Sequence, residues 1–253
     1  MSFDVAADAY TRFMGRFSEP LADVFLDWAG PPALGGTALD VGCGAGALTA
    51  CLVDHLGAEA VAAVDPSGHF VAATSARCPG VDVRRGSAEA LPFPDDSFDL
   101  VAAELVVHFM ADPVAGLREM RRVARPGSVV AACVWDHGGD TGPLSLFWRV
   151  ARQVVPSAPG EHELPGTREG HLAELFGAAG LAAVEAAPLT VTVAVAGAEA
   201  WWEPFTLGVG PAGAWVAGLD ASTRDRLRVA CLEALPRGPF EVTATAWSAR
   251  GLA

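Results

Sequence analysis

The chain has 253 residues, 17 of them basic and 30 acidic, which gives a formal net charge of −13. Because 51% of the residues are hydrophobic and only 19% are charged, the chain can bury a full-sized core and does not have the composition of a disordered protein. Every basic residue is an arginine. The sequence therefore excludes sites that need a lysine ammonium group: a Walker-type phosphate loop, a Schiff-base lysine and a Tyr/Lys catalytic pair.

The same composition limits the partners. An acidic chain without a basic stretch is a poor nucleic-acid binder. The longest uncharged stretches, 186–198 and 204–219, are shorter than the ~18 apolar residues that span a bilayer, and the N-terminus has no apolar segment typical of a signal peptide. The five cysteines and the loop histidines lack metal-ligand spacing. We expect a cytoplasmic protein with no metal, no nucleic-acid partner and no membrane partner, and the sequence leaves a homodimer open.

The first 135 residues alternate strand and helix patterns. An amphipathic helix is expected at 18–28, followed by strands at 37–41, 60–64, 81–85, 98–103 and 128–135. Helices fit between them at 45–55, 67–76 and 112–124, the last with an N-cap Asp and a first-turn Pro. This alternation is typical of a parallel sheet with helices on both faces.

The pattern changes after residue 135. Loops at 137–143 and 156–166 flank a helix at 146–155, and a helix at 168–178 leads into a β-rich segment, 181–195. An aromatic and glycine-rich stretch, 201–216, precedes a helix at 222–235 and a strand at 240–249. We predict a single domain over 1–253. It has a core with an N-terminal helical cap at 1–135, inserted helical lid elements around two sheet elements at 136–236, and a terminal strand at 237–253.

A glycine-rich turn follows the first predicted strand and opens a predicted helix. The segment reads LDVGCGAG over residues 39–46, and glycines there let the backbone turn tightly and approach a ligand at the helix N-terminus. Its spacing is G-x-G-x-G and does not match the dinucleotide pattern G-x-G-x-x-G. Asp65 ends the next predicted strand, where a carboxylate can accept hydrogen bonds from both hydroxyls of a ribose.

A third cluster, RGSAEALPF at 85–93, lies at the next crossover. Together LDVGCGAGALT, VDPS, GSAEALPFPDDSFDLV and REMRRVARPGSVV resemble the motifs of class I S-adenosylmethionine-dependent methyltransferases, in particular small-molecule enzymes of the quinone-biosynthesis type. The resemblance covers about residues 10–135. It implies S-adenosylmethionine as the cofactor and a Rossmann-like, doubly wound α/β fold. The seven-stranded sheet would be mostly parallel, with one antiparallel strand near the edge supplied by the terminal strand.

The resemblance also implies roles for individual residues. The methionine part of the cofactor would be surrounded by Asp40, Gly42, Cys43, Gly44 and Gly46, with Arg16 meeting its carboxylate. Asp65 would bind the ribose, and the adenine would lie among Pro66, Ser67, Ser87, Ala88 and Glu89. Ser87 stands where the family commonly has Asp; its hydroxyl can still accept from the adenine amino group, but without a charge.

Candidate catalytic residues follow the fourth predicted strand. Methyl transfer from a sulfonium needs mainly positioning, and an O–H, N–H or C–H acceptor benefits from a base. If residues 104–108 are helical, Glu104 and His108 share a face and couple. Tyr10, the only tyrosine, would cover the methyl group. The alternatives are that His108 bonds locally, that Glu104 binds cofactor or water, and that Tyr10 and Arg16 only anchor the N-terminal helix.

The acceptor is predicted from the aromatic residues. Six of the seven tryptophans lie at or after residue 135, and large flat side chains suit a small apolar, in particular aromatic, acceptor. We predict that the acceptor contacts Phe147, Trp148, Trp201 and Trp202. Two alternative functions use the same sheet: an NAD(P)-dependent oxidoreductase, and a protein that binds S-adenosylmethionine without catalysis.

Overall fold

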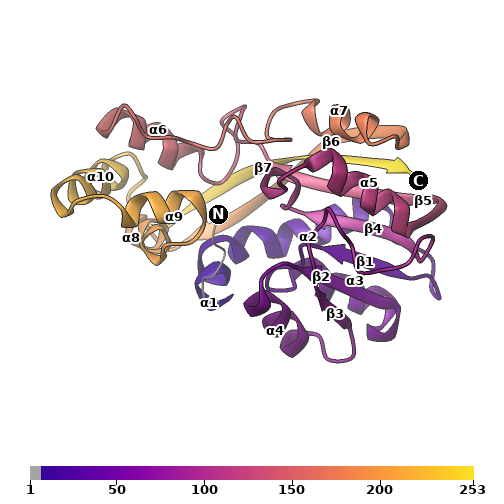
Figure 1. Cartoon of the computed structure of the whole chain (residues 1–253). Helices are drawn as coiled ribbons and strands as arrows, with labels where there is room; N and C mark the ends of the chain where they lie inside the picture. Colours follow the sequence, from indigo (N-terminus) through magenta and orange to yellow (C-terminus); the bar gives the residue numbers. More distant parts are fainter. Residues whose placement is uncertain (1–6) are drawn as a thin grey trace.

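The computed structural model describes residues 7–253. Within this part of the chain, seven strands form one sheet in the order β3-β2-β1-β4-β5-β7-β6 (Figure 1). All neighbours pair in parallel except that β7 is antiparallel to both β5 and β6, which confirms the predicted sheet. The strands are β1 (Ala38–Val41), β2 (Val61–Asp65), β3 (Asp82–Arg85), β4 (Phe98–Glu104), β5 (Ala124–Trp135), β6 (Ala182–Val195) and β7 (Phe240–Leu252).

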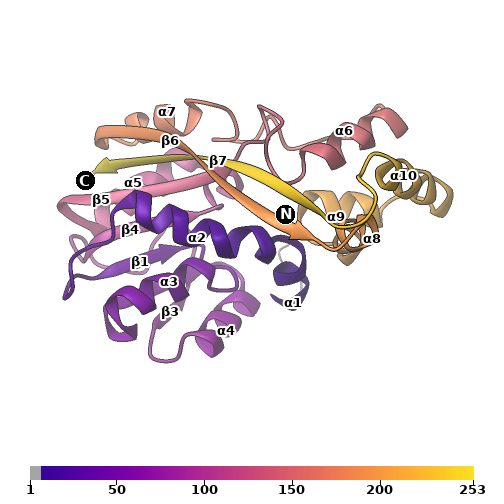
Figure 2. The same cartoon turned by 180° about the vertical axis from the view of Figure 1, so that it is seen from behind.

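Helices cover both faces of the sheet (Figures 1 and 2). Alternate residues of β4 divide between two hydrophobic clusters: Leu100 and Ala102 join one, and Val101 and Ala103 join the other. This period of two places a buried layer on each face. The first cluster includes α2 (Arg16–Ala29) and α3 (Ala47–Leu56), and the second includes α5 (Pro113–Val123) and α7 (His171–Ala178).

The N-terminal helical region begins earlier than the predicted helix at 18–28. The segment α1 (Ala7–Tyr10) runs through a π-helical turn at Thr11–Gly15 directly into α2, and Pro20 lies inside α2. Phe13 packs edge-to-face on Phe205 with ring centroids 5.3 Å apart, and Tyr10 packs on Phe70 of α4 (Gly68–Arg77) at 5.4 Å. Tertiary packing of these aromatic rings therefore extends the helix beyond the start that the proline suggests.

A helical cap lies where β6 and β7 extend beyond the rest of the sheet (Figure 2). The stretch 201–216, expected only to be aromatic and glycine-rich, is mostly helical. Phe147, Trp201 and Phe205 are each at most 1% exposed, and the rings of Phe147 and Phe205 stack 4.3 Å apart, so the cap has an aromatic core. Its elements are α6 (Ser145–Val154), α8 (Ala198–Trp202), a 3-10 turn (Glu203–Leu207), α9 (Gly210–Ala217) and α10 (Ala221–Glu233).

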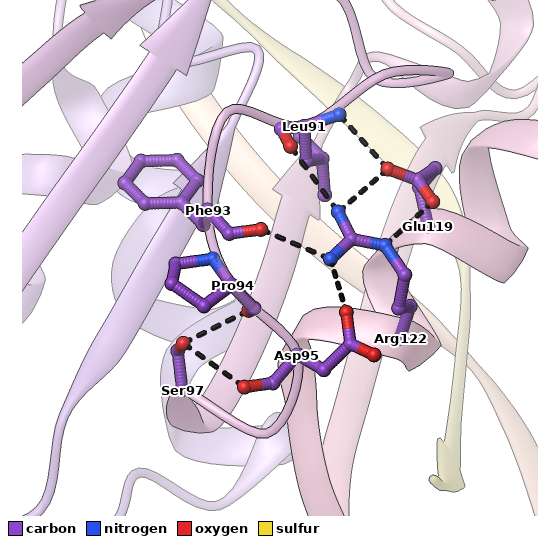
Figure 3. A network of polar contacts seen from close by, with 7 residues as sticks. All are labelled: Leu91, Phe93, Pro94, Asp95, Ser97, Glu119 and Arg122. Carbon is purple, nitrogen blue, oxygen red and sulfur yellow. Dashed lines mark hydrogen bonds and ion pairs between the residues drawn. The ribbon is translucent and has the colours of Figure 1, made fainter.

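Arg122 on α5 fixes the loop that joins β3 to β4 (Figure 3). Its guanidinium donates two hydrogen bonds to Glu119, at 2.7 and 2.8 Å, and one to Asp95 at 2.6 Å. It also donates to the backbone carbonyls of Phe93 and Leu91, and Glu119 accepts from the Leu91 N–H. A planar fork of donors suits this arrangement. The network ties the end of this loop to α5, and the start of the same loop, residues 86–89, lines a cleft at the carboxyl ends of the strands.

Candidate active site

A cleft of about 250 Å³ opens at the carboxyl ends of β1, β2 and β4. Strand order reverses there, because β2 lies on one side of β1 and β4 on the other; ligands of open α/β sheets bind at this kind of crevice. The cleft collects predicted residues from all three sequence clusters. Its lining includes Tyr10, Gly42, Gly44, Asp65, Pro66, Ser87, Ala88, Glu89 and Glu104.

The glycine turn has the close approach that its sequence predicts. The N–H groups of Gly42 and Cys43 both donate to the carbonyl of Val64, at 2.7 and 3.1 Å, which links the turn to β2. Gly42 has φ +76°, and a Cβ there would lie 2.6 Å from Cγ1 of Val106. Only glycine fits this position without a shift. Gly44 and Gly46 also have positive φ, at +52° and +82°.

Two buried carboxylates, those of Asp40 and Asp65, end the strands next to this turn. Asp40, 1% exposed, accepts a 2.6 Å hydrogen bond from the hydroxyl of Thr49 on α3, and burial raises the pKa of Asp40 to about 7. Asp65 accepts from the N–H groups of Gly44 at 3.0 Å and Ser67 at 2.8 Å; burial raises its pKa too. A carboxylate has about four lone-pair sites, so Asp65 keeps capacity for a ribose diol.

The side of the cleft predicted to hold adenine is formed by Ser87, Ala88 and Glu89. Glu89 accepts a 2.8 Å hydrogen bond from the N–H of Ala111. The Glu89 side chain therefore links this loop to the N-terminus of α5, where Asp112 is the N-cap. Cys43, Gly46 and Ser67 do not line the 250 Å³ cleft; Cys43 lines a smaller cavity of about 30 Å³ beside it, together with Asp40 and Glu104.

The expected helical pair of Glu104 and His108 is wrong. Glu104 ends β4, Leu105 has φ +61°, and only Val107–Phe109 form a 3-10 turn. This turn sends the two side chains to different cavities. Glu104 lines both cofactor-side cavities, while His108 lines a third cavity. Burial, and secondarily the charge of Asp40, raises the pKa of Glu104 well above its ordinary value. Among the described residues, its Oε1 atom has no hydrogen-bond partner.

The third cavity, which we call the acceptor cavity, measures about 40 Å³ and adjoins the cofactor cleft. Tyr10 and Leu105 line all three cavities, and Phe109 lines the cofactor cleft and the acceptor cavity. These residues therefore mark the junction. Burial raises the pKa of Tyr10, which keeps its phenol protonated. The remaining lining residues are Phe13, Met14, His108, Trp135, His137, Leu144, Glu161, Val209, Gly210 and Pro211.

His108 is 4% exposed and lies in this cavity. Its ring centroid is 3.8 Å from that of Phe109 and 6.3 Å from that of His137. Burial, with a smaller contribution from His137, lowers the pKa of His108 well below 6.5, so the imidazole is neutral near pH 7. Its buried Nδ1 atom has no partner within residues 7–253.

Seven predicted site residues line none of the three cavities: Gly46, Ser67, Arg16 and the four predicted acceptor contacts. Arg16 donates to the carbonyl of Ala200 at 3.3 Å and lies over the ring of Phe17, and it lines none of the three cavities. The four predicted acceptor contacts, Phe147, Trp148, Trp201 and Trp202, are at most 4% exposed and also line none of them. They pack among themselves and with Phe205 and Trp215, because aromatic rings gain most by burying each other.

The acceptor cavity instead contains residues that sequence reasoning passed over. Glu161 lies in a predicted loop, and His137 follows β5 at the start of another predicted loop. Leu144 and Val209 flank helices of the cap. The sequence does not single out Glu161, because a second acid, Glu163, lies in the same stretch between Gly160 and Pro165. It also carries no signal for Leu144 and Val209.

The comparisons with known proteins agree with this geometry. A family model described as "Methyltransferase domain" matches residues 39–132. The chain is 30% identical over 179 residues to the demethylmenaquinone methyltransferase of Bacillus licheniformis, an alignment that covers 63% of this chain and 76% of the relative. The chain belongs to the class I S-adenosylmethionine-dependent methyltransferases.

Two further matches show how far this relationship extends. A chloroplastic 2-methyl-6-phytyl-1,4-hydroquinone methyltransferase of rice is 34% identical over 144 residues, which cover 56% of this chain and 43% of the relative. The chain thus spans less than half the length of this relative. Among solved structures, a Haemonchus contortus phosphoethanolamine N-methyltransferase in complex with S-adenosyl-L-methionine superposes with a TM-score of 0.58 at 17% identity, over 97% of this chain and 56% of that one. This likeness concerns the fold.

Within residues 7–253 no helix combines the length and apolar character that a membrane span requires. Groups of three or more His, Cys, Asp or Glu residues that could hold a metal ion do not occur in the described part of the chain.

Proposed function

We propose that this protein transfers the methyl group of S-adenosylmethionine to a small, apolar, aromatic acceptor. The observation that carries the proposal is the junction of two cavities at Tyr10, Leu105 and Phe109: a cleft with the family's cofactor motifs on one side and a largely apolar cavity on the other. Relatives that methylate quinone precursors, by their names, support an aromatic acceptor.

The cofactor residues have separable roles in this proposal. Asp65 holds the ribose, and the backbone and side chains of residues 87–89 hold the adenine. Glu104 and Asp40 lie beside the cavity at the glycine turn, where the methionine part would reach. The buried Glu104 carboxyl has an oxygen without a hydrogen-bond partner among residues 7–253 and suits the α-ammonium group of the cofactor, since an opposite charge would favour its ionised form.

The chain's residues contribute mainly position and protection from water. The acceptor's lone pair forms a bond to the methyl carbon while the carbon–sulfur bond breaks and leaves its electron pair on sulfur, which yields S-adenosylhomocysteine. Tyr10, which lies in the N-terminal segment, covers the methyl group. The neutral His108 accepts a proton from the acceptor at Nδ1. Its lowered pKa makes it a weak base, so positioning supplies most of the rate.

The acceptor cavity is narrow, and this affects how an acceptor enters. A volume of about 40 Å³ accommodates part of an aromatic ring rather than a whole acceptor. Tyr10, Phe13 and Met14 of the N-terminal segment form one wall. We infer that this segment shifts outward to admit the acceptor, and that residues 136–236 supply acceptor recognition.

Titration calorimetry with S-adenosylhomocysteine tests the cofactor site. Asp65→Ala removes the carboxylate proposed to hold the ribose, and we expect affinity to fall by about 100-fold, because charge-assisted hydrogen bonds are worth ~1.5–3 kcal/mol each. Asp82→Ala, at an exposed acid on β3 that lines none of the three cavities, is the control. Unchanged affinity in Asp65→Ala, or binding of NAD in place of the sulfonium cofactor, would contradict the proposal.

A further inference from the structure

Glu161 is a buried acid that the proposed reaction does not use. It lies between α6 and α7, is 4% exposed and lines the acceptor cavity. Its Oε2 atom accepts a 2.7 Å hydrogen bond from the indole Nε1–H of Trp148, itself 3% exposed. Burying a carboxyl group costs free energy that a single hydrogen bond does not recover. A tryptophan N–H could be satisfied by a backbone carbonyl, so anchoring Trp148 alone does not explain an acid at this position.

Two further polar groups of the same cavity lack partners. His108 Nδ1 and the indole Nε1–H of Trp135 are buried and make no hydrogen bond within the described residues, and both residues line the cavity. Trp135 is 2% exposed. Buried polar atoms without a partner are uncommon and costly, which indicates that a bound molecule completes them. The cavity thus combines apolar walls with three polar groups: the Glu161 carboxyl, which accepts hydrogen bonds, the Trp135 N–H, which donates one, and the His108 imidazole.

We propose that Glu161 is the acceptor-anchoring residue of this methyltransferase, and that with Trp135 it binds an aryl hydroxyl group, which leaves His108 for the proton of the reacting atom. A hydroxyl can donate to the Glu161 carboxylate and accept from the Trp135 N–H at once, whereas an aromatic amine offers donors but a poor acceptor. Apolar walls formed by Phe13, Leu144 and Val209 receive the ring. This inference rests on the proposed function, because it names the acceptor class of the same site.

The protonation state of Glu161 supports this assignment. Burial raises the pKa of Glu161 to about 7, and the Trp148 hydrogen bond lowers it in part. The other titratable groups lining the cavity are Tyr10, whose pKa is raised, and His108 and His137, whose pKa values are lowered, the latter to about 4. Arg152 of α6 and His162 lie beside Gly160. The Tyr10 phenol and the two lining imidazoles therefore do not titrate near pH 7, and Glu161 does.

The first test is spectroscopic and needs no catalytic turnover. In the complex with S-adenosylhomocysteine, the indole N–H signal of Trp148, assigned with Trp148→Phe, should shift with pH around a midpoint near 7. Saturating phenol should move this midpoint downward, because a hydroxyl donor favours the carboxylate. Toluene, which has the same shape without the hydroxyl, should not. Equal shifts with phenol and toluene overturn the proposal.

The second test measures binding of the same probes by calorimetry. Phenol should bind the wild-type complex at least tenfold more tightly than toluene, and aniline less tightly than phenol. Glu161→Gln keeps an oxygen that can accept from Trp148 but removes the charge, and should lower the preference for phenol several-fold. Glu163→Gln, two residues on with a side chain 91% exposed, is the matched control and should leave it unchanged.

These outcomes are separable from the cofactor test. If Asp65→Ala and wild type bind S-adenosylhomocysteine equally, the proposed function is wrong whatever phenol does. If cofactor binding behaves as expected while Glu161→Gln retains the full preference for phenol, Glu161 only anchors Trp148 and the inference is overturned. Tighter binding of aniline than of phenol overturns the assignment of a hydroxyl.

Discussion

The cofactor cleft and the acceptor cavity meet at Tyr10 and Leu105, but they are built in different ways. The cleft is formed mainly by backbone: three glycines have positive φ, two N–H groups share one carbonyl, and the Asp65 carboxylate accepts from two backbone N–H groups. The acceptor cavity is formed by side chains from five separate parts of the chain, in and around the cap. The cofactor cleft therefore depends on local backbone geometry, and the acceptor cavity depends on how the cap packs.

We expect the largest effect from a substitution at Gly42, in the backbone turn that forms the cofactor cleft. Gly42→Ala places a Cβ against Val106, 2.6 Å from Cγ1, at φ +76°. We expect loss of measurable S-adenosylhomocysteine binding and a fall in the free energy of unfolding of several kcal/mol, since steric overlap adds to the ~1–2 kcal/mol of left-handed strain. Gly35→Ala has φ +93° but no atom within 4 Å, so it measures strain alone. Equal effects of the two variants, by calorimetry and chemical denaturation, would refute the steric argument.

A cap substitution should separate stability from cofactor binding. Trp201 is 1% exposed and its ring lies 4.9 Å from that of Phe205. Trp201→Ala should cost about 3–5 kcal/mol of unfolding free energy and leave affinity for S-adenosylhomocysteine within about twofold. Trp28→Ala, on α2 outside the cap, provides a comparison at a less buried tryptophan and should cost less. A large loss of cofactor affinity in Trp201→Ala would show that the two regions are coupled.

The sheet and the glycine turn were predictable from the sequence, whereas the arrangement of the acceptor cavity was not. The sheet and its antiparallel strand followed from strand and helix periodicity together with the family motifs, because parallel strands buried on both faces and glycine turns leave local signatures. The coupling of Glu104 and His108 failed because Leu105 adopts φ +61°, a conformation that its residue type does not announce. The sequence also predicts acceptor contacts for Phe147 and Trp201, which the structure buries in the cap. Aromatic residues line pockets and fill cores alike, so residue type alone does not separate these two environments.

The buried Glu161 carboxyl of the acceptor cavity should make the stability of the fold depend on pH. Burial raises the pKa of Glu161 to about 7 from an ordinary value near 4.5. Between these values the unfolded chain loses the proton and the folded chain keeps it, so this group destabilises the fold progressively as pH rises from about 4 to 7. The full penalty is up to about 3 kcal/mol. The buried His108 and His137 act oppositely, because their lowered pKa values cost stability as pH falls below about 6.5.

Comparing Glu161→Gln with wild type isolates the carboxyl from the histidines. The variant should have the higher melting temperature at pH 8, by several degrees, and the difference should shrink towards pH 5. Glu163→Gln, at an exposed acid, should follow wild type at every pH. A difference between Glu161→Gln and wild type that stays constant from pH 5 to 8 would mean that the buried carboxyl does not titrate in this range.

We expect the smallest effect at Arg122, which lies outside the cleft on α5 and anchors the loop that lines it. Arg122→Lys keeps the charge but cannot make two parallel hydrogen bonds to Glu119 while also reaching the carbonyls of Leu91 and Phe93. The loop that carries residues 87–89 should loosen, so we expect affinity for S-adenosylhomocysteine to fall about three- to tenfold and unfolding free energy by about 1 kcal/mol. Arg118→Lys on the same helix is the control: within the described residues Arg118 donates to the carbonyl of Ala178, so the variant should change stability with no effect on affinity. Equal affinity losses in both variants would mean that α5 acts through its packing and not through the Arg122 network.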